Sequence, residues 1–154
     1  MLIRGVTFKQ KIYSHCLQLL NNKIDELENI LKELGESAAK DTKSSAGDKH
    51  ETARAMIQIE QEAITKQLKD VFEQKVLLER TEEIQNQSQT IKGSLVKTNK
   101  GYLFLSIALG KITVDEKTVM VISPQSPLGI KLMGLKANEI AAINGMEYMV
   151  EFVY

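Results

Sequence analysis

The first part of the chain places its hydrophobic residues at the spacing of a long helix that packs against another helix. From Tyr13 onward the apolar positions follow one another in steps of four and three residues, and polar or charged residues fill much of the rest. The stripe consists of Tyr13, Leu17, Leu20, Ile24, Leu27, Leu31 and Leu34. A heptad of this kind predicts one side of a coiled coil. We expect the helix to end at Gly35, because glycine is favoured just beyond a helix C-terminus.

A second helix is predicted from Glu51 to about Ile84, a stretch that contains neither proline nor glycine. Its expected core face comprises Met56, Ile57, Ile64, Leu68, Val71 and Leu78, with Ala53 and Phe72 beside it. The complementary heptad position is weaker, because it holds Gln61 and Lys75. One antiparallel hairpin, closed by the small polar residues 36–47, satisfies both stripes within a single molecule.

Beyond a polar linker at residues 85–90, the chain changes to short runs that are rich in β-branched and aromatic residues, which is typical of strands. The predicted strands are 94–98, 102–109, 111–114, 118–122, 139–143 and 146–154. Between the fourth and fifth strands, Ser126 is a suitable N-cap and Pro127 suits the first position of a short helix that ends near Met133. The Asn-Gly pair at 144–145 is the strongest hairpin signal in the chain.

The last predicted strand alternates strictly, so one face of it should carry every second side chain. That face comprises Tyr148, Val150, Phe152 and Tyr154. The patterns together predict an α+β protein. It has an antiparallel coiled-coil hairpin at residues 1–86, with an acidic tip near 44–54, and a small, mostly antiparallel β domain with one short helix at 93–154.

Composition narrows the function classes. The 154 residues contain 20 lysines and arginines and 20 aspartates and glutamates, so the formal net charge is zero. Proteins that grip nucleic acid through its phosphates usually carry a basic excess, so strong binding of free nucleic acid is not expected. The single cysteine, Cys16, cannot form an internal disulfide. The first residues do not resemble a signal peptide, and no apolar run is long enough to span a membrane. These features predict a soluble, cytoplasmic protein.

The predicted β domain offers little chemistry of its own. It contains no histidine, cysteine or arginine, and its serines have no candidate base of the usual kind within the domain. A nucleophilic or general-base enzyme is therefore not predicted there. Neither half of the chain carries a phosphate-binding glycine loop or a zinc-type cluster of cysteines and histidines.

The candidate chemistry lies at the predicted tip, where Asp48 and Glu51 are three residues apart and share one face of a helix. In one interpretation they form a capping box, in which Asp48 is the N-cap and Glu51 reaches back to the backbone. In the other they are oxygen ligands for Mg²⁺, which often takes only one or two protein carboxylates and would need further ligands from a partner. The two interpretations are compatible.

Basic residues surround this acidic pair, and four of them are candidates for contacts at the tip. They are Lys43, Lys49, His50 and Arg54. Such cations are suited to bind phosphates or the wall of an acidic channel. The alternative is an ordinary solvated loop.

The order of these features resembles the bacterial Gre transcript-cleavage factors, a family of transcription elongation factors. The matching stretches are Gly47-Asp48-x-x-Glu51-x-Ala53, Gly93-Ser94-x-Val96, Ile122-Ser123-Pro124-Gln125-Ser126-Pro127-Leu128-Gly129 with Leu132 and Gly134, Asn138-Glu139, and Tyr148-x-Val150-x-Phe152-x-Tyr154. Their order and spacing, rather than any one of them, carry the resemblance, which covers nearly the whole chain.

The resemblance implies a function inside RNA polymerase. The hairpin would enter the secondary channel, and Asp48 and Glu51, which match the family's tip acids, would help the polymerase hold a second Mg²⁺ and orient a water. Backtracked RNA would then be cleaved near its 3′ end in the polymerase's own active centre. The chain would be an accessory factor rather than an enzyme, and would meet DNA only through the polymerase. The β domain resembles the family's FKBP-like domain and would dock at the channel rim, with no prolyl isomerase activity implied.

At the tip the sequence departs from the family pattern. Where those factors commonly continue Glu-Asn-Ala-Glu-Tyr, this chain has Glu51-Thr52-Ala53-Arg54-Ala55, so an acid is replaced by Arg54 and the aromatic residue is absent. Two alternatives are therefore kept. One is a regulator that occupies the channel without stimulating cleavage, and the other, in a different class, is a coiled-coil scaffold whose helices pair between chains. The weaker stripe of the second helix favours pairing within one chain, and hence a monomer.

Overall fold

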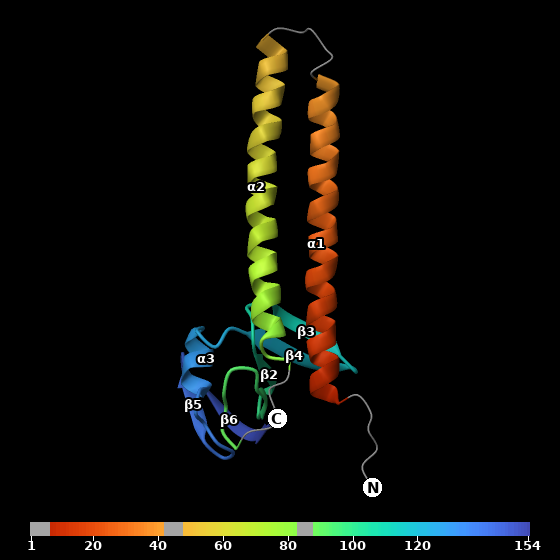
Figure 1. Cartoon of the computed structure of the whole chain (residues 1–154). Coiled ribbons are helices and arrows are strands. Elements are labelled where there is room, and N and C mark those ends of the chain that lie inside the picture. The colour runs from red at the N-terminus through yellow and green to blue at the C-terminus, as the bar shows by residue number, and fades with distance from the viewer. Residues whose placement is uncertain (1–6, 42–47, 83–87) are drawn as a thin grey trace. The chain divides into compact units, whose positions relative to one another are not determined.

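The computed structural model describes residues 7–41, 48–82 and 88–154, and of residues 41 and 48–50 it describes the backbone alone (Figure 1). Its elements are, in chain order, α1 (Phe8–Asp41), α2 (Asp48–Glu79), β1 (Leu95–Thr98), β2 (Gly101–Leu105), β3 (Gly110–Val114), β4 (Lys117–Ile122), α3 (Pro127–Leu132), β5 (Ile140–Ile143) and β6 (Met146–Val153). The protein is thus α+β, with two long packed helices followed by a six-stranded, mostly antiparallel sheet and a short helix.

The chain forms two compact units. The hairpin unit is Gln18–Lys75, and the sheet unit combines Met1–Leu17 with Val76–Tyr154. The sheet unit therefore includes the beginning of α1 and the end of α2 as well as all the strands. The domains predicted from the sequence, 1–86 and 93–154, stay a prediction.

In the hairpin unit, α1 and α2 lie side by side and bury the predicted heptad stripe (Figure 1). Leu20, Ile24 and Leu27 of α1 and Val71 of α2 are buried. Further stripe residues are half-buried, namely Leu31, Leu34, Ile57, Ile64 and Leu68. Each fully buried aliphatic side chain contributes about 1.5–3 kcal/mol, so this seam is the main source of stability for the hairpin. Within the described ranges no helix is both long and apolar enough to cross a membrane.

The helix limits differ from those predicted. The first helix continues past Gly35 to Asp41, so the prediction that it ends at Gly35 is wrong. A glycine inside a helix costs only about 1 kcal/mol relative to alanine. Gly35 does not adopt the positive φ of a left-handed cap, and Ala38 and Ala39 after it favour continuation. The second helix begins at Asp48 and ends at Glu79, earlier than predicted at both ends.

Two side chains that the sequence placed on the core face of α2 are instead exposed, Met56 by 65% and Phe72 by 44%. The half-buried and buried positions of this helix follow one another every three or four residues from Ala53. Met56 and Phe72 are not among these positions but lie next to them in the sequence. The buried stripe of an amphipathic helix that faces a single neighbour is narrow, so apolar residues next to it stay in solvent. The two weak positions, Gln61 and Lys75, are half-buried as the heptad requires.

The sheet unit contains one six-stranded sheet in the order β3-β4-β2-β1-β6-β5. Its neighbouring strands are antiparallel except β2 and β4, which run parallel because β4 inserts between β2 and the edge strand β3. The six predicted strands are confirmed, whereas the parallel pairing was not foreseen. Asn144 and Gly145 both have positive φ, 51° and 77°, as a tight Asn-Gly hairpin turn requires.

Side chains bury both faces of this sheet. On the face that carries α3, the core consists of Val96, Leu103, Leu105, Leu132, Ala141 and Val150. The opposite face presents Leu95, Phe104, Val119 and Val121, which are all buried. The beginning of α1 and the end of α2 reach this second face. The rings of Phe8 and Tyr102 meet edge to face with centroids 5.0 Å apart, and Thr81 Oγ1 lies 3.2 Å from Ser106 Oγ.

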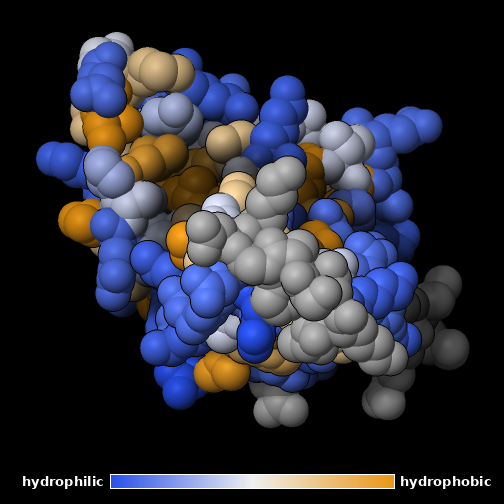
Figure 2. Space-filling view, turned by 90° about the horizontal axis from the view of Figure 1, so that it is seen from above, coloured by the Kyte–Doolittle hydropathy of each residue, from blue (hydrophilic) through white to orange (hydrophobic). Residues whose placement is uncertain are grey.

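The short helix α3 begins as predicted. Ser126 Oγ accepts a hydrogen bond from the Gly129 N–H at 3.1 Å and donates one to the Ser123 carbonyl at 2.6 Å, and Pro127 is the first helical residue. On its outer side Ile130 is 62% exposed. Figure 2 shows hydrophobic residues gathered over the part of the sheet unit that carries α3 and β5.

Part of the predicted linker at 85–90 belongs to the sheet unit. Thr90 is fully buried, its N–H donates to the Leu135 carbonyl at 2.8 Å, and its own carbonyl accepts from the Gly134 N–H at 2.8 Å. Its hydroxyl also donates to the Leu135 carbonyl. The polar composition was misleading because the polar groups of Thr90 are satisfied inside the protein rather than by water. Residues 83–87 lie outside the described part of the chain.

The last strand contains a β-bulge that its alternating sequence did not predict. Thr98 pairs with Val150 and Lys97 pairs with Phe152, so Glu151 is an extra residue in β6. The predicted face is therefore wrong beyond Val150, which is fully buried, because Phe152 is 60% exposed. Val153 packs against the core in place of Phe152.

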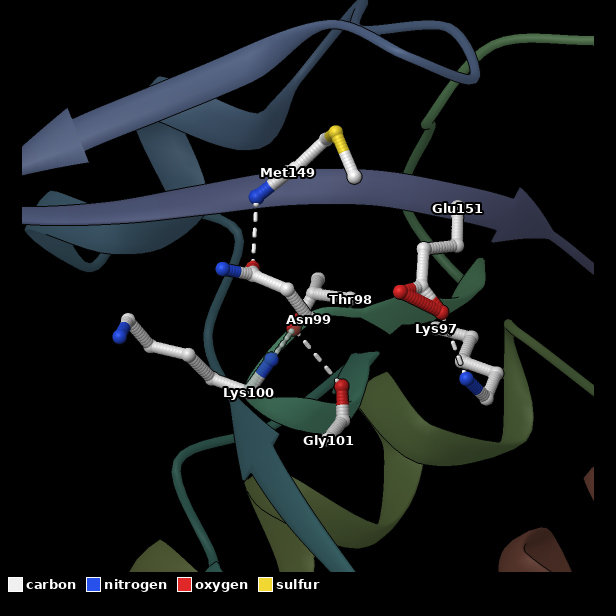
Figure 3. Close-up of polar contacts among 7 residues, drawn as sticks. All are labelled: Lys97, Thr98, Asn99, Lys100, Gly101, Met149 and Glu151. Carbon is white, nitrogen blue, oxygen red and sulfur yellow. Dashed lines mark hydrogen bonds and ion pairs between the residues drawn. The ribbon is translucent and has the colours of Figure 1, made fainter.

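Polar contacts hold the strands together on both sides of the bulge (Figure 3). Asn99 Oδ1 accepts a hydrogen bond from the Met149 N–H at 2.8 Å, and the Asn99 N–H donates to the Met149 carbonyl at 3.2 Å. The Lys97 ammonium and the Glu151 carboxylate form an ion pair at 2.6 Å. The bulge is thus stabilised by the hydrogen bonds between Asn99 and Met149, which resemble the pairing of two strands, and by the salt bridge that Glu151 forms with Lys97.

Two glycines give a matched test of this packing. A Cβ at Gly129 would overlap the Ser123 carbonyl oxygen and lie 2.9 Å from Ser126 Oγ, whereas a Cβ at Gly35 would meet no atom within 4 Å. We expect Gly129→Ala to lower the free energy of unfolding by roughly 1–3 kcal/mol, because the cap of α3 must shift. Gly35→Ala should raise it by about 0.5–1 kcal/mol. Urea unfolding followed by circular dichroism measures both changes, and effects of the same sign would contradict the described packing.

Candidate functional site

The first turns of α2 carry the candidate site, which lies in the hairpin unit. Positions 48, 51 and 54 are each three residues apart, so they follow one another along one face of the helix. The side chains of Glu51 and Arg54 are exposed, whereas Ala53 and Ile57 are half-buried on the side of the helical seam. The helix therefore presents Glu51 and Arg54 to solvent while its other side packs on α1.

The structure describes the predicted site residues to different extents. Asp48, Lys49 and His50 form the first turn of α2, and their side chains lie outside the described part. Lys43 lies outside the described residues altogether. The helix begins at Asp48 itself, whereas a capping box would place Asp48 one position before the helix. Because helix ends are defined only to within one or two residues, the capping box stays a prediction.

The Glu51 carboxylate is exposed. The ion pairs of the described residues join Lys11 with Asp115, Lys23 with Glu26 and Lys97 with Glu151, and none involves Glu51 or Arg54. An exposed carboxylate at a helix N-terminus is also favoured by the helix dipole, which steadies the negative charge in that first turn.

The donor chemistry at the tip fits Mg²⁺, which prefers carboxylate oxygens and keeps several of its waters. Among the side chains that the structure describes, no group of three or more His, Cys, Asp or Glu could hold a metal ion. A metal held by Asp48 and Glu51 would therefore depend on ligands from a partner, and the predicted Mg²⁺ stays a prediction.

Among the side chains that the structure describes, the most strongly perturbed titratable groups lie in the sheet unit. Burial raises the pKa of the Cys16 thiol to about 12, and this cysteine is fully buried and forms no disulfide. Burial, the negative charges of Glu82 and Glu79, and a hydrogen bond to Glu82 raise the pKa of Tyr13 to about 12. The sequence pattern did not reveal that Glu82 and Glu79 act on Tyr13. The available signal was a tyrosine on a buried heptad position, because a buried phenol needs a hydrogen-bond partner.

No family model matches the chain, and neither a curated protein nor a solved structure matches it. The fold, a helical hairpin followed by a six-stranded mixed sheet with one short helix, is therefore what the structure establishes about its class.

The raised pKa values of Cys16 and Tyr13 predict a loss of stability at alkaline pH. Both groups are neutral when protonated, and the folded state holds these protons to a higher pH than the unfolded state, whose values are near 9.0 and 10.0. Their contribution is therefore complete below about pH 9 and is lost as the pH rises toward 12. We expect the free energy of unfolding in urea to fall by about 2 kcal/mol between pH 8 and pH 10.5.

Cys16→Ala and Tyr13→Phe are the variants that test this cause. Each removes one titrating group, so each should flatten the dependence of stability on pH above pH 9. Tyr148→Phe is the matched control, because Tyr148 lies on β6 in the core on the other face of the sheet. If the free energy of unfolding of Cys16→Ala and Tyr13→Phe falls with pH as steeply as that of the unchanged protein, other groups cause the loss of stability.

Proposed function

We propose that this protein is an accessory factor of RNA polymerase that inserts its helical hairpin into the secondary channel and stimulates cleavage of backtracked RNA. The observation that carries the proposal is the start of α2. A helix that pairs with α1 through a buried seam opens at Asp48, and the exposed Glu51 follows one turn later. This arrangement holds carboxylates on a stiff support, which is what a site completed by another protein requires.

In the proposed mechanism, Asp48 and Glu51 donate carboxylate oxygens to a second Mg²⁺ and orient a water, and the polymerase's own metal-binding aspartates supply the other ligands. Two metals about 4 Å apart stabilise both the attacking and the leaving oxygen of phosphodiester hydrolysis. Lys43, Lys49, His50 and Arg54 contact phosphates or the channel wall. The FKBP-like sheet domain docks at the channel rim. The zero net charge supports recognition of a protein channel rather than of free nucleic acid.

One observation favours the second candidate function, a regulator that occupies the channel without stimulating cleavage. Arg54 is exposed and lies three residues after Glu51, on the face that carries the acidic positions. A cation one helical turn from a carboxylate competes with a metal ion for the same negative charge. This competition weakens the proposed Mg²⁺ site while leaving the hairpin and its entry into the channel intact.

A cleavage assay on halted elongation complexes tests the first function. We expect the protein alone to hydrolyse nothing, and to shorten the RNA of backtracked complexes in the presence of Mg²⁺. Asp48→Asn or Glu51→Gln should lower the cleavage rate at least about 10-fold, because each removes a charged metal ligand, and should leave polymerase binding largely intact. Glu60→Gln, at another exposed glutamate of α2, is the matched control and should keep the full rate.

The same assay separates the two candidates. RNA shortening that persists in both tip variants would disprove the role of the carboxylates. If RNA is not shortened but the protein competes with a genuine cleavage factor for the polymerase, the non-cleaving regulator is the correct function.

The scaffold alternative makes a different prediction about mass. The buried seam residues Leu20, Ile24 and Leu27 are covered within one chain, so little apolar stripe is left to pair with a second copy. We expect light scattering to give the mass of a single chain, 17.3 kDa. A mass that is a multiple of this value, together with no retention on immobilised polymerase, would favour a coiled-coil scaffold.

A further inference from the structure

The first half of α2 carries a short apolar stripe on its outer side, away from the buried seam. Met56 and Ile59 are 65% and 66% exposed, which makes them the two most exposed large hydrophobic side chains of the described residues. Ala55 and Ala63 are also exposed and lie on the same side of the helix. We name these four residues the tip stripe, and they lie in the part of α2 that is drawn in yellow (Figure 1).

The tip stripe continues a helical face that begins at position 48. Ala55 and Ile59 lie seven and eleven residues after Asp48, and such steps keep successive positions on one side of an α-helix. At a rise of 1.5 Å per residue, Met56 and Ile59 lie about 12 and 17 Å along the helix from position 48. A protein surface that receives the start of α2 therefore meets the tip stripe as well.

The exposed apolar surface is confined to one helix of the pair. On α1 the single large hydrophobic side chain that is exposed among the described residues is Leu19, by 38%, and it lies far from the tip in the sequence. The seam residues Ile57 and Ile64 of α2 are half-buried, whereas Met56 and Ile59 are not needed for this packing. Apolar side chains gathered on one side of an otherwise polar helix indicate a surface that contacts another macromolecule.

Negative charge borders the tip stripe. Glu60 lies four residues after Met56 and Glu62 lies three residues after Ile59, so each is next to the stripe on the helix surface. Both side chains are exposed, and neither takes part in an ion pair of the described residues. The stripe ends at Lys66, three residues after Ala63. A surface that covers Met56 and Ile59 therefore needs apolar side chains opposite them and cations opposite the two glutamates.

The same features argue against two other occupants. A nucleic acid would bring phosphates against Glu60 and Glu62, which repel them. A second copy of the chain would bring the same two carboxylates to the border of the contact, and like charges that face each other oppose association. Two large side chains also supply only a small part of the about 1,200–2,000 Å² that a stable protein complex buries. The tip stripe must therefore belong to a larger contact, and the tip residues that precede it on the same face provide one.

We propose that the tip stripe binds an apolar patch bordered by basic side chains on the protein that completes the tip site. The inference rests on the proposed function, in which that protein is RNA polymerase and the patch lies on the wall of its secondary channel. The stripe supplies affinity and sets the depth of insertion, whereas the carboxylates supply the chemistry. Both candidate functions need this contact, because a regulator that does not stimulate cleavage enters the channel in the same way.

Binding of the full chain to RNA polymerase tests the proposal. Fluorescently labelled protein is titrated with the polymerase, and the Kd is obtained from the change in anisotropy. The double variant Met56→Gln with Ile59→Gln should raise the Kd at least about 10-fold, because two apolar contacts are lost. It should keep the Tm measured by circular dichroism, because both side chains are exposed. The cleavage rate at saturating protein should also stay unchanged, because the stripe takes no part in hydrolysis.

Two further substitutions separate the stripe from the rest of α2. Phe72→Gln is the matched control, since it removes another exposed apolar side chain of α2, 13 residues after Ile59 and on another side of the helix. It should keep the Kd of the unchanged protein. Glu62→Lys should raise the Kd, most strongly at low ionic strength, because a cation then faces the basic border of the patch.

The outcomes distinguish a failure of this inference from a failure of the proposed function. If the unchanged protein does not bind the polymerase, the proposed function is wrong and this inference fails with it. If the unchanged protein binds but the double variant keeps its Kd, or if Phe72→Gln weakens binding equally, this inference alone is wrong. A dimer mass in light scattering that becomes the mass of one chain in the double variant would identify a second copy as the occupant, and would also overturn the inference.

Discussion

Burial of the apolar stripe of α1 is the interaction on which the rest of the structure depends. In the sheet unit this helix buries Ile12 and Cys16, and in the hairpin unit it buries Leu20, Ile24 and Leu27, all with at most 6% of their surface exposed. One helix therefore contributes to two cores. Each of the leucines and isoleucines among them contributes about 1.5–3 kcal/mol. A break in the regular spacing of these residues would therefore cost one unit or the other a large part of its stability. The negative charges of Glu82 and Glu79 near this stripe contribute to the raised pKa of Tyr13.

The parts of the fold that could be predicted from the sequence are those set by local chemistry. The 3-4 spacing from Tyr13 to Leu34, the Ser126-Pro127 start of α3 and the turn at 144–145 each depend on a few neighbouring residues, and the structure has all three. The features of the fold that were not predicted depend on contacts between residues that are distant in the sequence. The parallel pairing of β2 with β4 follows from where β4 inserts in the sheet. The bulge at Glu151 lies in the pairing of β6 with β1, next to the hydrogen bond from the Met149 N–H to Asn99 Oδ1. Local alternation carries no information about either contact.

The candidate site shows a different limit. The spacing of Asp48 and Glu51 predicts a shared helical face, and the start of α2 at Asp48 agrees with that placement. Two carboxylates that complete a metal site in another protein need no third ligand from their own chain, so they form no metal-site pattern in the sequence. Their proposed chemistry therefore comes from resemblance to a family. A cleft in the sheet unit was not predicted for another reason. Lys9, Glu82 and Lys117, which line it, are far apart in the sequence, and only the packing of α1 and the end of α2 on the sheet brings them to one cavity.

The two units meet different physical requirements. A tip that acts inside another protein needs a stiff support and exposed charge, and an antiparallel helical pair with a narrow buried seam provides both with few constraints on its outer residues. This freedom is consistent with the exposure of Arg54 and Ala55, which contribute nothing to the buried seam. A pocket that binds a small molecule needs enclosure from several elements and fixed relative positions of its polar groups. In this chain the sheet unit, where strands and the ends of both long helices pack together, supplies such enclosure. A site that another protein must complete is thus expected on the hairpin. A binding pocket that this chain forms by itself is expected on the sheet.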